Sequence, residues 1–199
     1  MATMEEVLQF WFGDLGPDEP VPVHWSQFWF GGAAEVDAAI RQRFAATVTT
    51  ALEGDFEEWR QTPRGTLALI LLLDQFPRNI YRGTAEAYAG DSRALQLCRE
   101  GCRRGFDRRL TTVRRAFFYL PLEHAEERQA QIDSVAAFKA LLAQAPPALE
   151  ETCRGFLDYA QRHRDIIERF DRFPHRNAVL GRISTQEEEL FLREPGSRF

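Results

Sequence analysis

The stretch from residue 66 to residue 79, TLALILLLDQFPRN, constrains the fold of this chain more than any other feature. After its threonine, every residue up to Leu73 is apolar, so a helix formed here has no polar face and must be buried on all sides. Thr62 and Pro63 give a start signal, a capping hydroxyl followed by a proline in the first turn, and Pro77 predicts the end. We expect a buried helix over residues 63–75.

The remainder of the chain also has the patterns of helices separated by short breaks. Over residues 33–53 apolar side chains recur every four residues before Gly54, and no long stretch alternates with period two. These patterns predict an all-α protein, a single domain over residues 1–199 with about seven to nine antiparallel helices.

Three helix boundaries carry specific expectations. Asp91 is expected to N-cap a helix that ends near Gly105. Pro121 suits the first turn of a new helix that reaches about residue 142. Ser184 and Glu187 fit a capping box before the last helix.

Charge and composition exclude several partners. With 25 basic and 30 acidic residues the formal charge is −5, and we interpret the Arg-rich segment 99–115 as a solvated face, so nucleic acid is not an expected partner. Three cysteines are too few and odd in number for a disulfide framework, and the first ten residues do not resemble a signal peptide. The apolar run is too short to span a membrane. We expect a cytoplasmic protein without a membrane partner.

One sequence pattern occurs twice. Residues 74–79 read DQFPRN and residues 171–177 read DRFPHRN, and each is followed by a further arginine, Arg82 or Arg182. Arginine and asparagine can bond the free carbonyls at a helix C-terminus, which explains one copy. Two copies at separate helix ends favour a shared polar site.

These motifs resemble a bacterial family known as domain of unknown function 924. The resemblance is carried by LALILLLDQFPRNIYRGTA at 67–85, FFYLPLEHAEERQAQ at 117–131, HRDIIERFDRFPHRNAVLGRISTQEE at 163–188 and FWFGD at 10–14. It implies an all-helical fold similar to tetratricopeptide-like proteins, and no established activity. The chain departs from the family pattern at Leu122 and Ala125, where Phe and Ser are expected, and at Asp171, where Gly is expected. Asp171 either adds a carboxylate to the site or pairs with Arg172.

The segment 121–131 is the main candidate for chemistry. We expect it to begin a helix that places His124, Glu127 and Gln131 on one face, where a histidine beside a carboxylate can transfer protons. A metal needs three or four ligands, and His163, His175 and Asp74 lack diagnostic spacing, so no metal and no cofactor is expected. Phosphate-binding, dinucleotide-binding and hydrolase motifs do not occur in the sequence.

We predict a polar cleft that binds a small anionic molecule clamped by arginines. Its candidate residues are Asp74, Arg78, Asn79, Arg82, His124, Glu127, His163, His175, Arg176, Asn177 and Arg182. A first alternative is a protein-interaction scaffold in which the polar cluster is structural. A second is an enzyme that uses an acid–base pair in the same cleft, with His124, Glu127 and His163 as catalytic candidates.

Overall fold

The central helix begins as predicted and is buried along its length. The structure is a computed structural model that describes residues 1–17 and 19–197. Thr62 Oγ1 accepts a hydrogen bond from the Gly65 amide at 3.0 Å, and Pro63 opens α4 (Pro63–Ile70). The π-helical turn η2 (Leu71–Gln75) and α5 (Phe76–Ile80) continue it, and residues 67–74 are at most 1% exposed.

Pro77 does not end this helix, contrary to the sequence prediction. In an α-helix its ring would collide with the carbonyl of Leu73, and that carbonyl would also lose its amide donor. The wider turn η2, in which the Phe76 amide bonds to the Leu71 carbonyl, accommodates the proline. The helix therefore continues one turn further than expected and delivers Arg78 from inside a helix.

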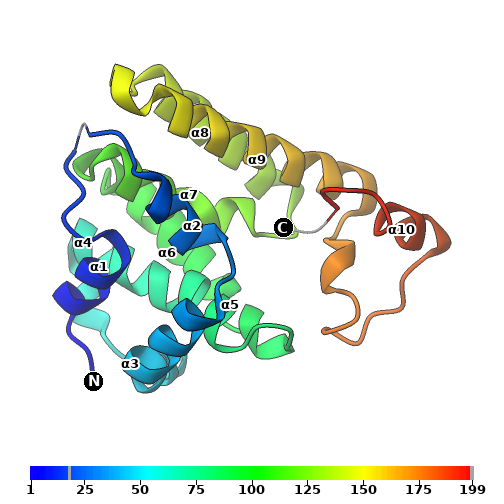
Figure 1. Cartoon of the computed structure of the whole chain (residues 1–199), viewed down its shortest axis with the longest axis horizontal. Helices are drawn as coiled ribbons and strands as arrows, with labels where there is room; N and C mark the ends of the chain where they lie inside the picture. The colour runs from blue at the N-terminus through cyan, green and yellow to red at the C-terminus, as the bar shows by residue number, and fades with distance from the viewer. Residues whose placement is uncertain (18, 198–199) are drawn as a thin grey trace.

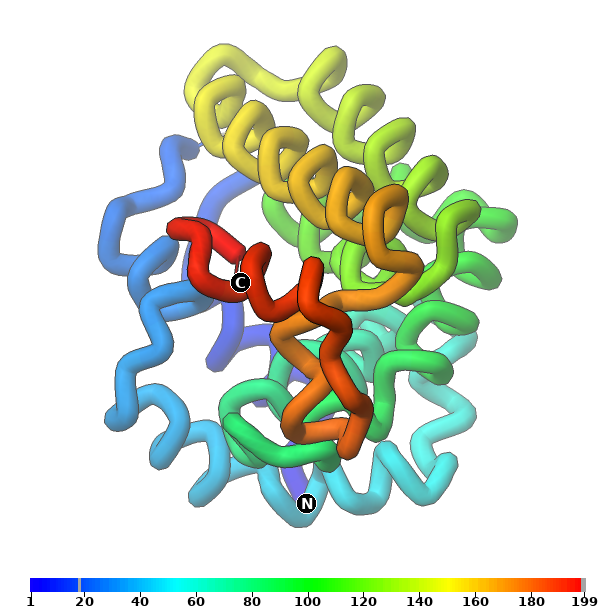
Figure 2. The backbone as a smooth tube through the Cα atoms, turned by 90° about the vertical axis from the view of Figure 1, so that its right-hand side faces the viewer, coloured from blue at the N-terminus to red at the C-terminus, as the bar shows by residue number. Residues whose placement is uncertain are grey.

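The other helices surround this axis. They include α1 (Met4–Phe12), α2 (Val23–Phe30), α3 (Ala34–Glu53), α6 (Asp91–Arg103) and α7 (Thr112–Glu123) (Figure 1). The long helices α8 (Arg128–Ala143) and α9 (Glu150–Phe170) form an antiparallel pair, followed by α10 (Gln186–Phe191). After α9 the chain folds back beside the green segment that precedes α6, which brings the two repeated motifs together (Figure 2).

Two apolar clusters stabilise this arrangement. The main one joins α1 to α9 around the central helix, and the Trp11 ring contacts the rings of both Phe76 and Phe117. The smaller one contains Ile166, Ile167 and Phe173 and fixes the segment after α9. Counting the continuous run from α4 to α5 as one helix, the described residues form nine α-helices and no strands. The all-α prediction is confirmed, and the tetratricopeptide-like arrangement stays a prediction.

Two predicted boundaries were wrong. Helix α7 runs through Pro121 and ends at Glu123, and α8 starts only at Arg128. The side chains of residues 116–122 are all buried, and burial worth about 1.5–3 kcal/mol for each large one outweighs the roughly 3 kcal/mol cost of an interior proline. The capping box of α10 uses Thr185 and Glu188, one residue later than expected.

Asp91 is the first residue of α6 and makes no cap hydrogen bond, so that expectation was also wrong. Among the residues that the structure describes, no helix combines the length and apolar character needed to cross a membrane.

Gly90 permits the close approach of the chain to η2. A Cβ built at this position would lie 2.2 Å from the backbone oxygen of Leu73, the carbonyl left without its usual donor by Pro77. We expect Gly90→Ala to lower the free energy of unfolding by about 1–3 kcal/mol through overpacking. Denaturant melts measure this change.

Gly155→Ala is the matched control, because a Cβ at Gly155 in α9 meets nothing within 4 Å. It should raise the free energy of unfolding by about 0.5–1 kcal/mol. Equal effects of the two substitutions would contradict the close approach at Leu73.

Candidate functional site

Charged and aromatic side chains from five segments meet at the C-terminal end of the central helix. They come from η2 and α5, from η3 (Ala85–Tyr88) and the start of α6, from the end of α7, from the middle of α9 and from the turn η6 (Pro174–Arg176). We call this group the polar centre: Asp74, Arg78, Tyr88, Asp91, Glu123, His124, His163 and Arg176.

Asp74 lies at the bottom of the polar centre and is fully buried. Its Oδ1 is 2.7 Å from His124 Nδ1 and 3.2 Å from an Arg78 nitrogen, and its Oδ2 accepts from Gln75 Nε2 at 2.5 Å. Burial opposes ionisation, but the charge of Arg78 and the hydrogen bonds from His124 and Gln75 hold the pKa of Asp74 below its usual value. Asp74 is therefore an ionised, buried carboxylate.

Arg78 is completely paired. Its two terminal nitrogens bond the two oxygens of Asp91 at 2.9 and 3.0 Å, and it also donates to the backbone oxygen of Asp74. Burial lowers the pKa of Arg78, but the charges of Asp74 and Asp91 outweigh burial and raise it. This two-pronged pair explains why the Asp91 side chain does not cap α6.

Arg176 is buried but poorly neutralised. Its side chain is 7% exposed, and among the described residues its one ion pair is a 3.3 Å contact with the Asp91 oxygen that Arg78 already occupies. Its Nε is buried and has no hydrogen-bond partner in the part of the chain that the structure describes, and its guanidinium lies over the rings of Tyr88, at 4.6 Å, and Phe173, at 4.5 Å. Burial, followed by the charge of Arg78, lowers the pKa of Arg176.

Glu123 and His163 meet where α7 and α9 pack together. His163 Nδ1 is 2.9 Å from the Tyr159 carbonyl oxygen and 3.4 Å from Glu123 Oε1. Glu123 Oε2 is buried, and none of residues 1–17 and 19–197 gives it a hydrogen bond. Burial, reinforced by the charge of Asp74, raises the pKa of Glu123 to about 8. Burial lowers the pKa of His124 and of His163, so both rings are neutral at neutral pH.

The convergence that the repeated motif predicted is present for five candidates: Asp74, Arg78, His124, His163 and Arg176. The structure directs the other side chains elsewhere. In the first motif, Asn79 Nδ2 donates to the carboxylate of Asp37 on α3 at 2.8 Å. Arg82 donates to the same carboxylate from Nε and Nη2, at 2.7 and 2.8 Å. They fasten the end of the central helix to α3.

In the second motif, Asn177 bonds Ser184 at 3.1 Å and Glu188 at 3.3 Å. Arg182 bonds both oxygens of Glu126, at 2.6 and 2.9 Å. These contacts close the loop between α9 and α10 through side-chain hydrogen bonds, and not through the capping of free helix carbonyls.

Glu127 does not share a helix face with His124, because the chain leaves the helix after Glu123; it is exposed and pairs with Arg99 at 2.8 Å. His175 packs beside the ring of Phe173, and burial lowers its pKa to about 4.

Asp171 is exposed and pairs with Arg128 rather than Arg172. Its φ of 57° is left-handed, which explains why glycine is expected there.

Sequence reasoning missed Tyr88, Asp91 and Glu123 as members of the centre. The one available signal was for Glu123, which ends an apolar run as Asp74 does and is likewise buried. Asp91 has the sequence pattern of a helix N-cap, and no sequence pattern marks Tyr88 as part of a polar site.

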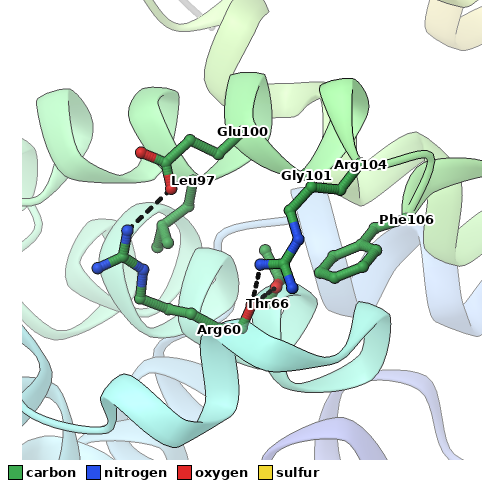
Figure 3. Close-up of a pocket in the computed structure, with 7 residues that line it drawn as sticks. All are labelled: Arg60, Thr66, Leu97, Glu100, Gly101, Arg104 and Phe106. Atoms are coloured by element: carbon green, nitrogen blue, oxygen red, sulfur yellow. Dashed lines mark hydrogen bonds and ion pairs between the residues drawn. The ribbon is translucent and has the colours of Figure 1, made fainter.

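Two hollows lie away from the polar centre. One, of about 10 Å³, lies between η1 (Glu57–Gln61), α4 and α6 beside the Arg60–Glu100 ion pair and holds at most one water (Figure 3). The other is an open depression of about 330 Å³ lined by Arg169, Phe170, Asp171, Arg172, Thr185, Glu187 and Glu188. Neither includes a residue of the polar centre.

Removing Arg78 tests the electrostatics of the centre. In Arg78→Gln, Asp74 stays buried after losing its arginine, so we expect a loss of about 3–5 kcal/mol in the free energy of unfolding. Arg128→Gln is the control, because its partner Asp171 is exposed and the midpoint should barely move. Equal denaturant midpoints for the two variants would show that Asp74 does not depend on Arg78.

Comparison with known proteins identifies the family. The family model described as bacterial protein of unknown function (DUF924) matches residues 7–196. The chain is similar to the solved structure of ATU0120, a protein of unknown function from Agrobacterium tumefaciens, with 37% identity, a TM-score of 0.80 and 96% of each chain covered. Among the curated proteins, no match is found. The resemblance seen in the motifs is confirmed, and the chain belongs to the DUF924 family.

Proposed function

We propose that the protein binds a small anionic molecule, with a carboxylate or phosphate group held by Arg176. The observation that carries this proposal is the incomplete neutralisation of Arg176, a buried guanidinium whose single ion pair is shared with Arg78. A buried cation without a full partner is costly, and an anion supplies that partner.

The neighbouring contacts allow Arg176 to change partners. Both oxygens of Asp91 are already bonded to Arg78, so loss of the 3.3 Å contact leaves Asp91 paired. Tyr88 and Phe173 hold the guanidinium plane by stacking, which leaves its edge to bond an anion in a two-pronged manner.

Solvent reaches this part of the centre from the Arg78 side. The side chains of Arg78 and Asp91 are 21% and 19% exposed, whereas Asp74 beneath them is fully buried. An anion therefore approaches Arg176 along the Arg78–Asp91 pair, and Asp74 and Glu123 lie deeper.

An acid–base enzyme is the second candidate, and the Asp74–His124 contact of 2.7 Å favours it. A carboxylate accepts the proton of Nδ1, which leaves Nε2 of a neutral imidazole as a proton acceptor. The lowered pKa of His124 keeps the ring neutral and able to act as a base.

Thermal-shift and calorimetric titrations with inorganic phosphate, a dicarboxylate and a nucleoside monophosphate test anion binding. A ligand at 100 times its dissociation constant should add about 2.7 kcal/mol of stability. Arg176→Gln should abolish this response while leaving the stability of the free protein nearly unchanged, because the cation is poorly paired. Arg128→Gln, which removes a surface arginine instead, should keep the full response.

The opposite pattern would overturn the proposal. A loss above about 3 kcal/mol in Arg176→Gln, with no anion response in the parent protein, would make the polar centre an internal ion-pair network. The scaffold alternative would then be favoured.

A further inference from the structure

We propose that Glu123, His124 and His163 form a binding site for a divalent transition-metal ion. Each side chain offers one ligand atom, and the three atoms lie within 4.8 Å of one another. Glu123 and His124 end α7, and His163 projects from the middle of α9, so the two helices present the ligands from different directions.

The orientation of both histidines supports this site. His124 Nδ1 faces the Asp74 carboxylate at 2.7 Å, and His163 Nδ1 faces the Tyr159 carbonyl at 2.9 Å. Both oxygens can only accept, so in the neutral rings the proton sits on Nδ1 and Nε2 carries a lone pair. Metal-binding histidines are held in this way, with the other ring nitrogen donating to a carboxylate or a backbone carbonyl.

Glu123 gives a second, independent observation. Its side chain is 5% exposed, and its Oε2 is buried without a hydrogen-bond partner. Such an oxygen is costly to bury unless a cation or a donor satisfies it. A metal ion bound by Glu123 supplies the missing partner.

The local charges can balance a doubly charged ion. A metal ion that binds Glu123 displaces the proton of its carboxyl group, so Glu123 and Asp74 then provide two negative charges. Arg78 is neutralised separately by the bidentate bond to Asp91. Metal bonds of about 2.0–2.2 Å place tetrahedral ligand atoms roughly 3.3 Å apart, so the side chains must close by about 1–1.5 Å from their 4.8 Å spread.

The donor set also indicates the class of ion. Two imidazoles and one carboxylate suit zinc, iron, manganese or cobalt, whereas magnesium and calcium prefer oxygen ligands alone. Three protein ligands leave a position open, as in catalytic rather than structural sites. The sequence expectation of no metal rested on spacing along the chain, and ligands at 123, 124 and 163 form no short motif.

Titration of the full chain with Zn²⁺ or Co²⁺ alone, after dialysis against a chelator, tests this site without any anion. At 100 times the dissociation constant the melting midpoint should rise by roughly 5–10 °C. Bound Co²⁺ should give the visible absorption of a nitrogen- and oxygen-ligated ion. Glu123→Gln and His163→Gln should each weaken binding at least about 100-fold, and Asp74→Asn, which positions His124, about 10–100-fold.

Two control variants separate this site from other metal-binding groups. His24→Gln removes an exposed histidine and Cys102→Ser removes a partly exposed thiol, and both should leave the affinity unchanged. Circular dichroism checks that each variant is folded, and if Glu123→Gln unfolds, His163→Gln and Asp74→Asn decide.

Failure to bind either metal would overturn the proposal, as would unchanged affinity in both Glu123→Gln and His163→Gln. Loss of binding in Cys102→Ser would assign the ion to the thiols and would also overturn it. None of these outcomes bears on the anion response of Arg176, which is measured without metal.

Discussion

The burial of one carboxylate, Asp74, at the end of an apolar helix is the constraint on which the rest of the structure depends. A carboxylate removed from water costs several kcal/mol unless charges and donors surround it. The Asp74 carboxylate forms an ion pair with Arg78 and hydrogen bonds with His124 and Gln75. Asp91 in turn neutralises Arg78 and fixes its orientation. The positions of α6 and α7 relative to the central helix are therefore fixed by charge as well as by apolar packing.

The π turn η2 allows Asp74 and Arg78 to make these contacts. It accommodates Pro77, so the chain remains helical beyond Asp74 and Arg78 can reach back to the Asp74 backbone oxygen and forward to Asp91. Single π turns inside helices are frequent at functional sites, because they turn side chains off the regular helical positions at a cost in backbone stability. Here the turn places Asp74 and Gln75 together on the buried side.

The sequence predicted the features that depend on local pattern. The apolar run predicted the buried helix, Thr62 and Pro63 its start, and the repeated motif the approach of Arg78 to Arg176. Features that depend on competition between local signals and packing were mispredicted. Pro121 and Pro77 were expected at helix boundaries, yet burial kept α7 helical through Pro121 and the wider turn η2 kept the chain helical through Pro77. Asp91 has the pattern of a cap, and a cationic partner from another segment captured it instead.

The two copies of the motif show how similar residues acquire different roles. In each copy the asparagine and the later arginine bond carboxylates on other segments. In the first copy both bond Asp37. In the second copy the asparagine bonds Glu188 and the arginine bonds Glu126. Each copy also turns one arginine inward. Arg78 arrives within a helix and takes both oxygens of Asp91, whereas Arg176 arrives from a short turn and can only share one of them. One carboxylate cannot saturate two guanidiniums, so the centre keeps one cation that is incompletely paired, beside two oriented imidazoles and the carboxyl group of Glu123. That imbalance distinguishes the polar centre from the closed ion pairs at the helix ends, and it is the physical reason for proposing an anion-binding site there.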